Sequence, residues 1–351
     1  MNTVGEETPM TDTGADMPAK DVNKKRSGPT GHYAKFERRL KVWPAYEKAA
    51  TSHEPHWFKD LLSLWRPSGH SSGEAGLRVA IRNGYLNFYR LGQSVARVEC
   101  VSGKLRADVH YKYVLDEPPP GLKPKSPYVR LTTKSVSYRG TWVADYKGLS
   151  TLHEWISAAE KDHAQPEKSI VDGLVAKNDN VVDLEMAIPA WARSKSAVRM
   201  DLVAIENGTV VFWEVKTILN SEILCEAALE EDKFPPVLEQ LAKYRVFLEQ
   251  DSHPKLVQDA YRNTAKLLVK LRKLADKLGP ALALGSSIVT ASQADTLAVA
   301  SRAALVVVDL PEDNKRNWNS WKASHEGKLK GKIPMCVLEN PGPLVFACAS
   351  E

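Results

Sequence analysis

The segment 200–217 constrains the fold of this chain most, because it predicts a β-hairpin that carries charged residues on hydrophobic strands. Asn207-Gly208 is a strong signal for a two-residue turn, and MDLVAI and TVVFWEVKT on either side have strand composition. Side chains alternate between the faces of a strand, so Glu214 and Lys216 point the same way. The turn brings Asp201 across from Glu214. Three charges on a hydrophobic hairpin are costly unless they pair or bind a metal ion.

Helical patterns flank this hairpin. Pro166 opens a helix that has Glu167 in its first turn, and VVDLEMAI follows as a strand. Downstream, PPVLEQLAKYRVFL begins a helix on which Gln240 and Tyr244 lie four residues apart, on one face. LVVVD (305–309) has the composition of a buried strand. Glu185, on the strand VVDLEMAI, is either a solvated edge residue or a second carboxylate near the hairpin charges.

The hairpin charges by themselves leave two interpretations open. The simpler one is a salt bridge between Lys216 and Asp201 or Glu214. The other is a catalytic centre, because two carboxylates beside an ammonium are the groups that metal-assisted hydrolysis uses. The order of charged residues and of helices around the hairpin favours the second interpretation.

In that order, Glu167, Asp201, Glu214-Val215-Lys216 and then Gln240-x-x-x-Tyr244, the chain resembles the PD-(D/E)xK nuclease superfamily, and its last helix is similar to the RecB-like branch. The resemblance covers about residues 160–250. It implies an α/β fold (α+β overall) with a restriction-endonuclease-like αβββαβ core, whose last strand would be 305–309. Met200, not proline, precedes Asp201 here.

The resemblance also implies a mechanism, metal-dependent hydrolysis of DNA phosphodiester bonds. Mg²⁺, or Mn²⁺, prefers oxygen ligands, and Asp201, Glu214 and the backbone carbonyl of Val215 would supply them. Lys216 would orient or deprotonate the attacking water, or stabilise the pentavalent phosphorus. Glu167 would complete the outer metal shell. By the same resemblance, Gln240 and Tyr244 would position the DNA backbone or the metal-bound water.

The region before residue 151 predicts a separate unit. Residues 1–30 contain few large apolar side chains and are expected to be a disordered tail. Residues 31–150 are expected to form a smaller antiparallel β-rich domain, with four strands across 77–114 separated by turns at Asn83-Gly84, Leu91-Gly92 and Ser102-Gly103. Basic residues on these strands, Arg78, Arg82 and Arg90 among them, suit either a nucleic-acid groove or an ordinary half-buried sheet. The nuclease-like domain would span 151–351.

Composition limits the remaining classes. The chain has 351 residues and a net charge of +5, which permits DNA as a partner without requiring it. Four widely spaced cysteines argue against a zinc ribbon and a disulfide scaffold. The sequence has no apolar run that could cross a bilayer and no secretory signal at its start, so we expect a cytoplasmic protein with no membrane contact. A homodimer, and a partner or sensor ligand of the N-terminal domain, remain open.

Two further functional classes are compatible with the same residues. One is a catalytically silent nucleic-acid-binding protein on a nuclease scaffold. The other is a sensor-effector nuclease of a defence system, with residues 31–150 as the sensor. A long helical pattern over 253–279 also presents Arg262, Lys266, Lys270, Lys273 and Lys277 on one face, either as a DNA backbone track or as a solvated surface.

Overall fold

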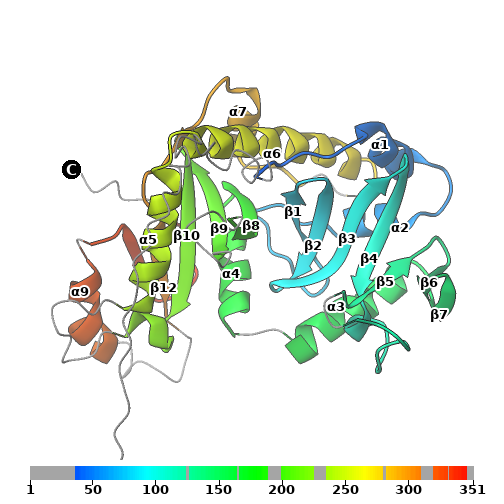
Figure 1. Cartoon of the computed structure of the whole chain (residues 1–351), viewed down its shortest axis with the longest axis horizontal. Coiled ribbons are helices and arrows are strands. Elements are labelled where there is room, and N and C mark those ends of the chain that lie inside the picture. Colours follow the sequence, from blue (N-terminus) through cyan, green and yellow to red (C-terminus); the bar gives the residue numbers. More distant parts are fainter. Residues whose placement is uncertain are drawn as a thin grey trace, which may run out of the picture.

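The computed structural model contains two β-sheets that stand side by side, with a long helix across one end of both (Figure 1). It describes residues 36–123, 126–163, 166–188, 199–224, 235–279, 282–309, 319–330 and 332–345. The expected disordered tail, residues 1–30, lies outside the described residues. The fold is therefore mixed α/β, with an antiparallel sheet preceding a mixed one.

The first sheet is a continuous antiparallel meander. Its strands follow chain order, β1 (Arg78–Arg82), β2 (Tyr85–Arg90), β3 (Gln93–Val101), β4 (Lys104–His110), β5 (Tyr128–Leu131), β6 (Ser135–Tyr138) and β7 (Thr141–Asp145). The four strands and three turns expected across 77–114 are confirmed. Leu91-Gly92 has φ of 44° and 72°, and Ser102-Gly103 has 49° and 76°, as type I′ hairpin turns require.

Helices that precede, interrupt and follow the strands pack with the first sheet. Within the described residues these are α1 (Trp43–Thr51), α2 (Trp57–Ser63), the 3₁₀ turn η2 (Tyr111–Tyr113) and α3 (Leu149–His163). α3 contacts β2, β3, η2 and α2. It therefore packs with the first sheet, although the boundary expected at residues 150/151 assigns it to the second unit.

The second sheet has the strand order β13-β12-β10-β9-β8, and β11 pairs with the start of β10. Its strands are β8 (Val181–Ala187), β9 (Arg199–Glu206), β10 (Thr209–Thr217), β11 (Ala298–Val299), β12 (Ala304–Val308) and β13 (Met335–Leu338). β8, β9 and β10 are antiparallel neighbours, whereas β10, β12 and β13 run parallel. Asn207 and Gly208, with φ of 49° and 79°, form the predicted turn between β9 and β10.

The helices of this half are α4 (Pro166–Lys177), η3 (Ser221–Ile223), α5 (Pro236–Leu248), α6 (His253–Ala275), α7 (Ser286–Gln293), η4 (Lys322–Glu326) and α9 (Gly327–Leu329). Thus α4, β8, β9, β10, α5 and β12 follow one another in the order helix, three strands, helix and strand, with α6, α7 and β11 between α5 and β12. The strand expected at 305–309 is β12, shifted by one residue.

Strand alternation divides the core around β10 into two layers. Val211, Trp213 and Val215 belong to the hydrophobic cluster that contains α4. On the opposite face, the Phe212 ring lies 5.6 Å from the Tyr244 ring of α5 and 6.0 Å from the Tyr261 ring of α6, between centroids. Glu214 and Lys216 have the same parity as Phe212, so they leave the strand toward the layer of α5 and α6.

A buried ionic cluster joins the two sheets. The carboxylate of Asp183 on β8 is fully buried and pairs with Arg38 and with Arg82 of β1. The Tyr261 hydroxyl of α6 donates to the same carboxylate at 3.2 Å. The main hydrophobic cluster likewise contains residues of both sheets. The two halves therefore share one core.

Three arginines of the first sheet are structural. Arg78 pairs with Asp172 at 2.7 Å, Arg82 with Asp183, and Arg90 with Glu160 at 3.0 Å, and all three arginines are buried. These three cations face the acids of the neighbouring elements instead of solvent. These three arginines are therefore not part of a nucleic-acid groove, one of the two alternatives that the sequence left open.

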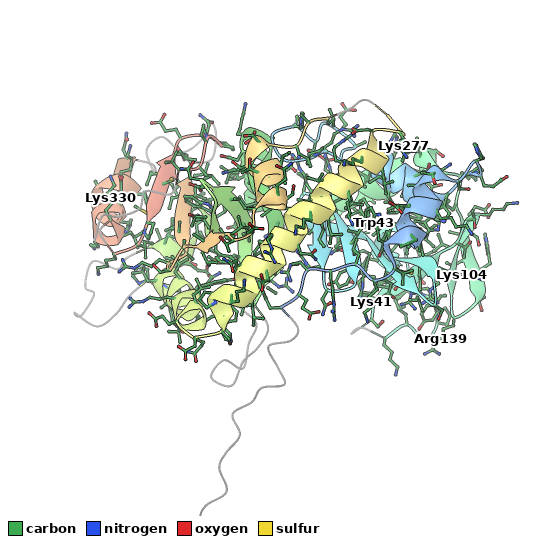
Figure 2. All side chains as sticks on the ribbon, turned by 90° about the horizontal axis from the view of Figure 1, so that it is seen from above. Lys41, Trp43, Lys104, Arg139, Lys277 and Lys330 are labelled. Atoms are coloured by element: carbon green, nitrogen blue, oxygen red, sulfur yellow. The ribbon has the colours of Figure 1, made fainter. Side chains whose placement is uncertain are left out.

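The basic face of α6 is at the surface. Figure 2 shows α6 crossing both sheets, with Trp43 beside it and Lys277 just beyond its end. Lys266, Lys270, Lys273 and Lys277 are exposed, and none of them forms an ion pair with another described residue. The Lys270 ammonium lies 5.5 Å from the centroid of the Trp43 ring. This arrangement is compatible with both interpretations of the lysines.

Candidate active site

The charged residues of the hairpin meet where β9 begins and β10 ends. The paired register of the two strands ends at Leu202 and Trp213, one step before Asp201 and Glu214. In place of a further backbone pair, the Val215 amide donates to Asp201 Oδ2 at 2.9 Å. The Asp201 side chain therefore occupies the end of the ladder and is fixed to β10. Asp201 and Glu214 are on the same face of the sheet, as the sequence predicts.

Lys216 lies between two carboxylates. Its Nζ is 2.8 Å from Glu214 Oε1 and 2.7 Å from Glu222 Oε2. Burial lowers the pKa of Lys216, but the negative charges of Glu214 and Glu222 outweigh it and hold that pKa above its usual range. The side chain is consequently a protonated hydrogen-bond donor at neutral pH. Glu222 lies in η3, where nothing in the sequence pattern marked it.

Glu214 is a buried carboxyl group whose ionisation is disfavoured. Only 3% of the residue is exposed. Burial and the neighbouring charge of Asp201 raise its pKa from 4.5 to about 8, although Lys216 and Gln240 favour the ionised form. Its Oε2 is buried and has no hydrogen-bond partner among the described residues. A buried carboxyl oxygen without a hydrogen-bond partner is rare, and a bound cation is one explanation for it.

A second lysine, which the sequence analysis did not select, enters the site from α4. Lys168 Nζ is 2.5 Å from Glu185 Oε1 and 3.1 Å from Asp201 Oδ1. Glu185 lies between Leu184 and Met186, which pair with Leu202 and Met200, so it faces Asp201 across β8 and β9. Glu185 is thus part of the cluster. Lys168 could have been found from its place beside Glu167 in the first turn of the helix.

Glu167 lies at the start of α4, as predicted, and Asn220 donates to its Oε2 at 3.1 Å. Burial raises the pKa of this carboxyl, Lys216 and the Asn220 amide oppose the rise, and the charge of Asp201 adds to it. The charges of Asp201 and Lys216 therefore act on Glu167, which lies beside the other carboxylates of the site.

The two helix residues of the motif differ in position. Gln240 donates to the backbone carbonyl of Arg199, the first residue of β9, at 3.0 Å, and it also favours ionised Glu214. Tyr244 is fully buried beneath the site, beside Phe212 and Met186. Burial raises its pKa well above the usual value, and so do the charges of Tyr261, Glu214 and Asp201. At this depth Tyr244 supports the site from the core and does not face the surface.

The whole group is acidic. Five carboxylates (Glu167, Glu185, Asp201, Glu214 and Glu222) surround the two ammonium groups of Lys168 and Lys216. Among the described residues, no three His, Cys, Asp or Glu side chains come together in a way that could hold a metal ion. The ammonium groups and the Val215 amide engage both oxygens of Asp201 and one oxygen each of Glu185, Glu214 and Glu222. Among the described residues of this group, Glu214 Oε2 is a buried oxygen without a hydrogen-bond partner, and Glu214 lies beside Asp201.

The comparisons with known proteins add no assignment. No family model, curated protein or solved structure matches this chain. In the part of the chain that the structure describes, no helix is both long and apolar enough to cross a bilayer.

Proposed function

We propose that this protein is a metal-dependent nuclease that hydrolyses phosphodiester bonds of DNA. The observation that carries the proposal is the buried and unpartnered Oε2 of Glu214, beside Asp201 and on the same carboxyl group that holds Lys216. A carboxylate in this state is stabilised by a cation, and a divalent ion also acidifies water and polarises a phosphate when bound. The remaining chemistry falls to residues of this chain.

The donor set fits Mg²⁺ or Mn²⁺ by its chemistry. Asp201 and Glu214 offer two carboxylates, and the carbonyl of Val215 between Glu214 and Lys216 offers a third oxygen, whereas Mg²⁺ usually takes one or two carboxylates plus waters. Glu167 lies close enough to sense Asp201 and would order the water around the ion. Gln240 holds the start of β9 and Tyr244 the floor of the site, so both act by positioning.

Lys216 has one role that its electrostatics favours. Because Glu214 and Glu222 keep its amine protonated, it does not accept a proton at neutral pH. As a donor it would orient the attacking water and stabilise negative charge on the phosphoryl oxygens, a contribution worth about 10²–10³-fold in similar positions. General base catalysis by Lys216 would require the loss of both carboxylate partners.

The element order supports the proposed fold assignment. The succession α4, β8, β9, β10, α5 and β12, with β12 parallel to β10, is that expected for a restriction-endonuclease-like core of the RecB-like branch. On this proposal the substrate is DNA and the protein acts in the cytoplasm. A homodimer and a ligand of the first sheet would add to this function and are not required by it.

Incubation with linear, circular and single-stranded DNA in Mg²⁺, Mn²⁺ or EDTA tests the proposal. The protein should cleave at least one substrate in the presence of metal, and EDTA should abolish cleavage. Asp201→Ala and Lys216→Ala should lower the rate by at least about 10²-fold. Glu249→Ala and Lys177→Ala, changes at exposed positions just after α5 and at the end of α4, should leave it unchanged. Equal cleavage by wild type and both site variants would exclude this centre as its source.

One observation favours a second candidate function, that of a silent DNA-binding scaffold. Both oxygens of Asp201 are engaged, Oδ1 by Lys168 and Oδ2 by the Val215 amide. On a silent scaffold, those contacts would replace the metal. Calorimetric titration with Mn²⁺ separates the nuclease from the silent scaffold. The nuclease should bind Mn²⁺ and lose this binding when Glu214 is replaced, whereas the scaffold should bind DNA and no Mn²⁺ at Glu214. A sensor-effector nuclease would instead bind metal and cleave DNA only with its activator present.

A further inference from the structure

Lys168 occupies a position that has the geometry of a cation site. Its Nζ bridges Glu185 Oε1 and Asp201 Oδ1, at 2.5 and 3.1 Å, and only 18% of its side chain is exposed. Two carboxylates held together in a partly buried place repel each other unless a positive charge lies between them. A divalent ion is one way to supply that charge, and here an ammonium group of the chain supplies it.

Two contacts hold the ammonium group in place. Lys168 is in the first turn of α4, whose hydrophobic face is buried against β10. Its methylene stem lies under the β2–β3 turn, where a Cβ added to Gly92 would be 2.7 Å from Lys168 Cδ and 2.9 Å from Cγ. Glycine at this position lets the first sheet cover the lysine stem closely. The first sheet therefore forms a wall of the site.

The carboxylate oxygens divide between two positions. On the side of Glu185, the Lys168 charge bridges the two carboxylates of Glu185 and Asp201. On the side of Glu214, Oε2 is buried without a partner among the described residues. One side of Asp201 thus already has its cation, and on the other side a buried oxygen of Glu214 has no hydrogen-bond partner among the described residues.

We propose that Lys168 is the resident second cation of this centre, so that the protein binds a single divalent ion, at Asp201 and Glu214. The inference rests on the proposed function for the identity of that ion. It assigns Lys168 a positioning role: the ammonium group fixes Asp201 and Glu185 and excludes a second ion from between them. In two-metal sites the equivalent charge is supplied by another metal ion.

Titration with Mn²⁺ alone, followed by calorimetry and by the electron paramagnetic resonance of free Mn²⁺, tests this without any substrate. Wild type should bind one ion per chain. Lys168→Met removes the charge and keeps most of the stem, so Glu185 and Asp201 become available. This variant should bind a second ion, or bind the first at least about tenfold more tightly, because an ammonium within a few ångströms of a metal opposes it strongly.

Two variants control for other effects. Lys168→Arg keeps the positive charge and should bind one ion with wild-type affinity. Lys177→Met makes the same change at an exposed position of the same helix and should also match wild type. Thermal unfolding in EDTA and in Mn²⁺ reports on folding: Lys168→Met should lose stability in EDTA and gain more from Mn²⁺ than wild type does.

The remaining outcomes overturn the inference. They are two ions per wild-type chain, or a single ion in Lys168→Met with a change of affinity below about tenfold. If Lys168→Met does not fold, the wild-type stoichiometry and Lys168→Arg still decide. Wild type that binds no Mn²⁺ overturns both this inference and the metal requirement of the proposed function. Wild type that binds one ion but cleaves no DNA overturns the proposed function alone.

Discussion

The Val215 amide donates a hydrogen bond to Asp201 Oδ2 at 2.9 Å, so a carboxylate replaces a backbone acceptor where the β9–β10 ladder ends. This bond fixes the position of Asp201 relative to Glu214 without help from any ligand. The same carboxylate receives Lys168 through its other oxygen. Asp201 is therefore both a structural residue and a candidate metal ligand.

The two roles of Asp201 are separable by substitution. Asp201→Asn keeps an oxygen that can accept from Val215 and relieves repulsion with Glu214, but its NH2 group replaces the acceptor of Lys168. We therefore expect a smaller loss of stability than for Asp201→Ala. Asp201→Ala leaves the buried amide and Lys168 without this partner and should cost about 1–3 kcal/mol. Both variants should lose cleavage of DNA. Urea unfolding and a cleavage assay measure the two effects, and equal destabilisation by Asn and Ala would contradict the role of the hydrogen bond.

The raised pKa of Glu214 predicts how the stability of the metal-free protein depends on pH. In the folded state its carboxyl stays protonated up to about 8, whereas in the unfolded chain it ionises near 4.5. The folded state thus binds more protons in this interval, so the free energy of unfolding should fall as pH rises from about 4.5 to about 8. Unfolding in urea with EDTA across this range measures the slope.

Glu214→Gln is the control for that dependence. The amide cannot ionise, so the slope between these two pH values should flatten, while the contribution of other groups remains. At the alkaline end of the interval the variant should be more stable than wild type in EDTA. A slope equal to that of wild type would show that another group carries the dependence.

The Asp183 cluster should dominate the coupling between the sheets. Asp183→Ala leaves the guanidinium groups of Arg38 and Arg82 buried without their carboxylate, a change that typically costs about 3–5 kcal/mol. Glu249→Ala breaks an exposed pair with Arg245 and should cost at most about 1 kcal/mol. Urea unfolding followed by tryptophan fluorescence compares them. A loss as small as that of Glu249→Ala would mean that the sheets do not depend on this cluster.

The close contact between Gly92 and the Lys168 stem predicts that a change in the first sheet alters metal binding at the candidate site. Gly92→Ala introduces both backbone strain, at φ of 72°, and a close contact with the Lys168 stem. Gly103→Ala introduces the same kind of strain, at φ of 76°, with nothing within 4 Å of the added Cβ. We expect both to lose about 1 kcal/mol of stability, but only Gly92→Ala to change Mn²⁺ affinity, as measured by calorimetry. An identical metal isotherm for the two variants would contradict the contact.

Local rules of the sequence were sufficient for the hairpin at the centre of the site. Asn207-Gly208 tolerates positive φ at both positions, so it specifies a type I′ turn, and the two-residue period then places Glu214 and Lys216 on one face. Because these rules act over a few residues, they also predicted the four-strand meander and the helices that carry Glu167 and Gln240.

Tertiary packing alone decided which other charges reach the site and which leave the surface. Lys168, Glu185 and Glu222 join Asp201 and Lys216 because α4, β8 and η3 pack around the end of β10. The sequence left the place of Glu185 open between two alternatives, and it did not mark Glu222. In the same way, Arg82 finds Asp183 across 101 residues of chain. Charge pairing is long-range in sequence and depends on burial, so it is settled by the packed fold, whereas turns and strand periodicity are settled by neighbouring residues.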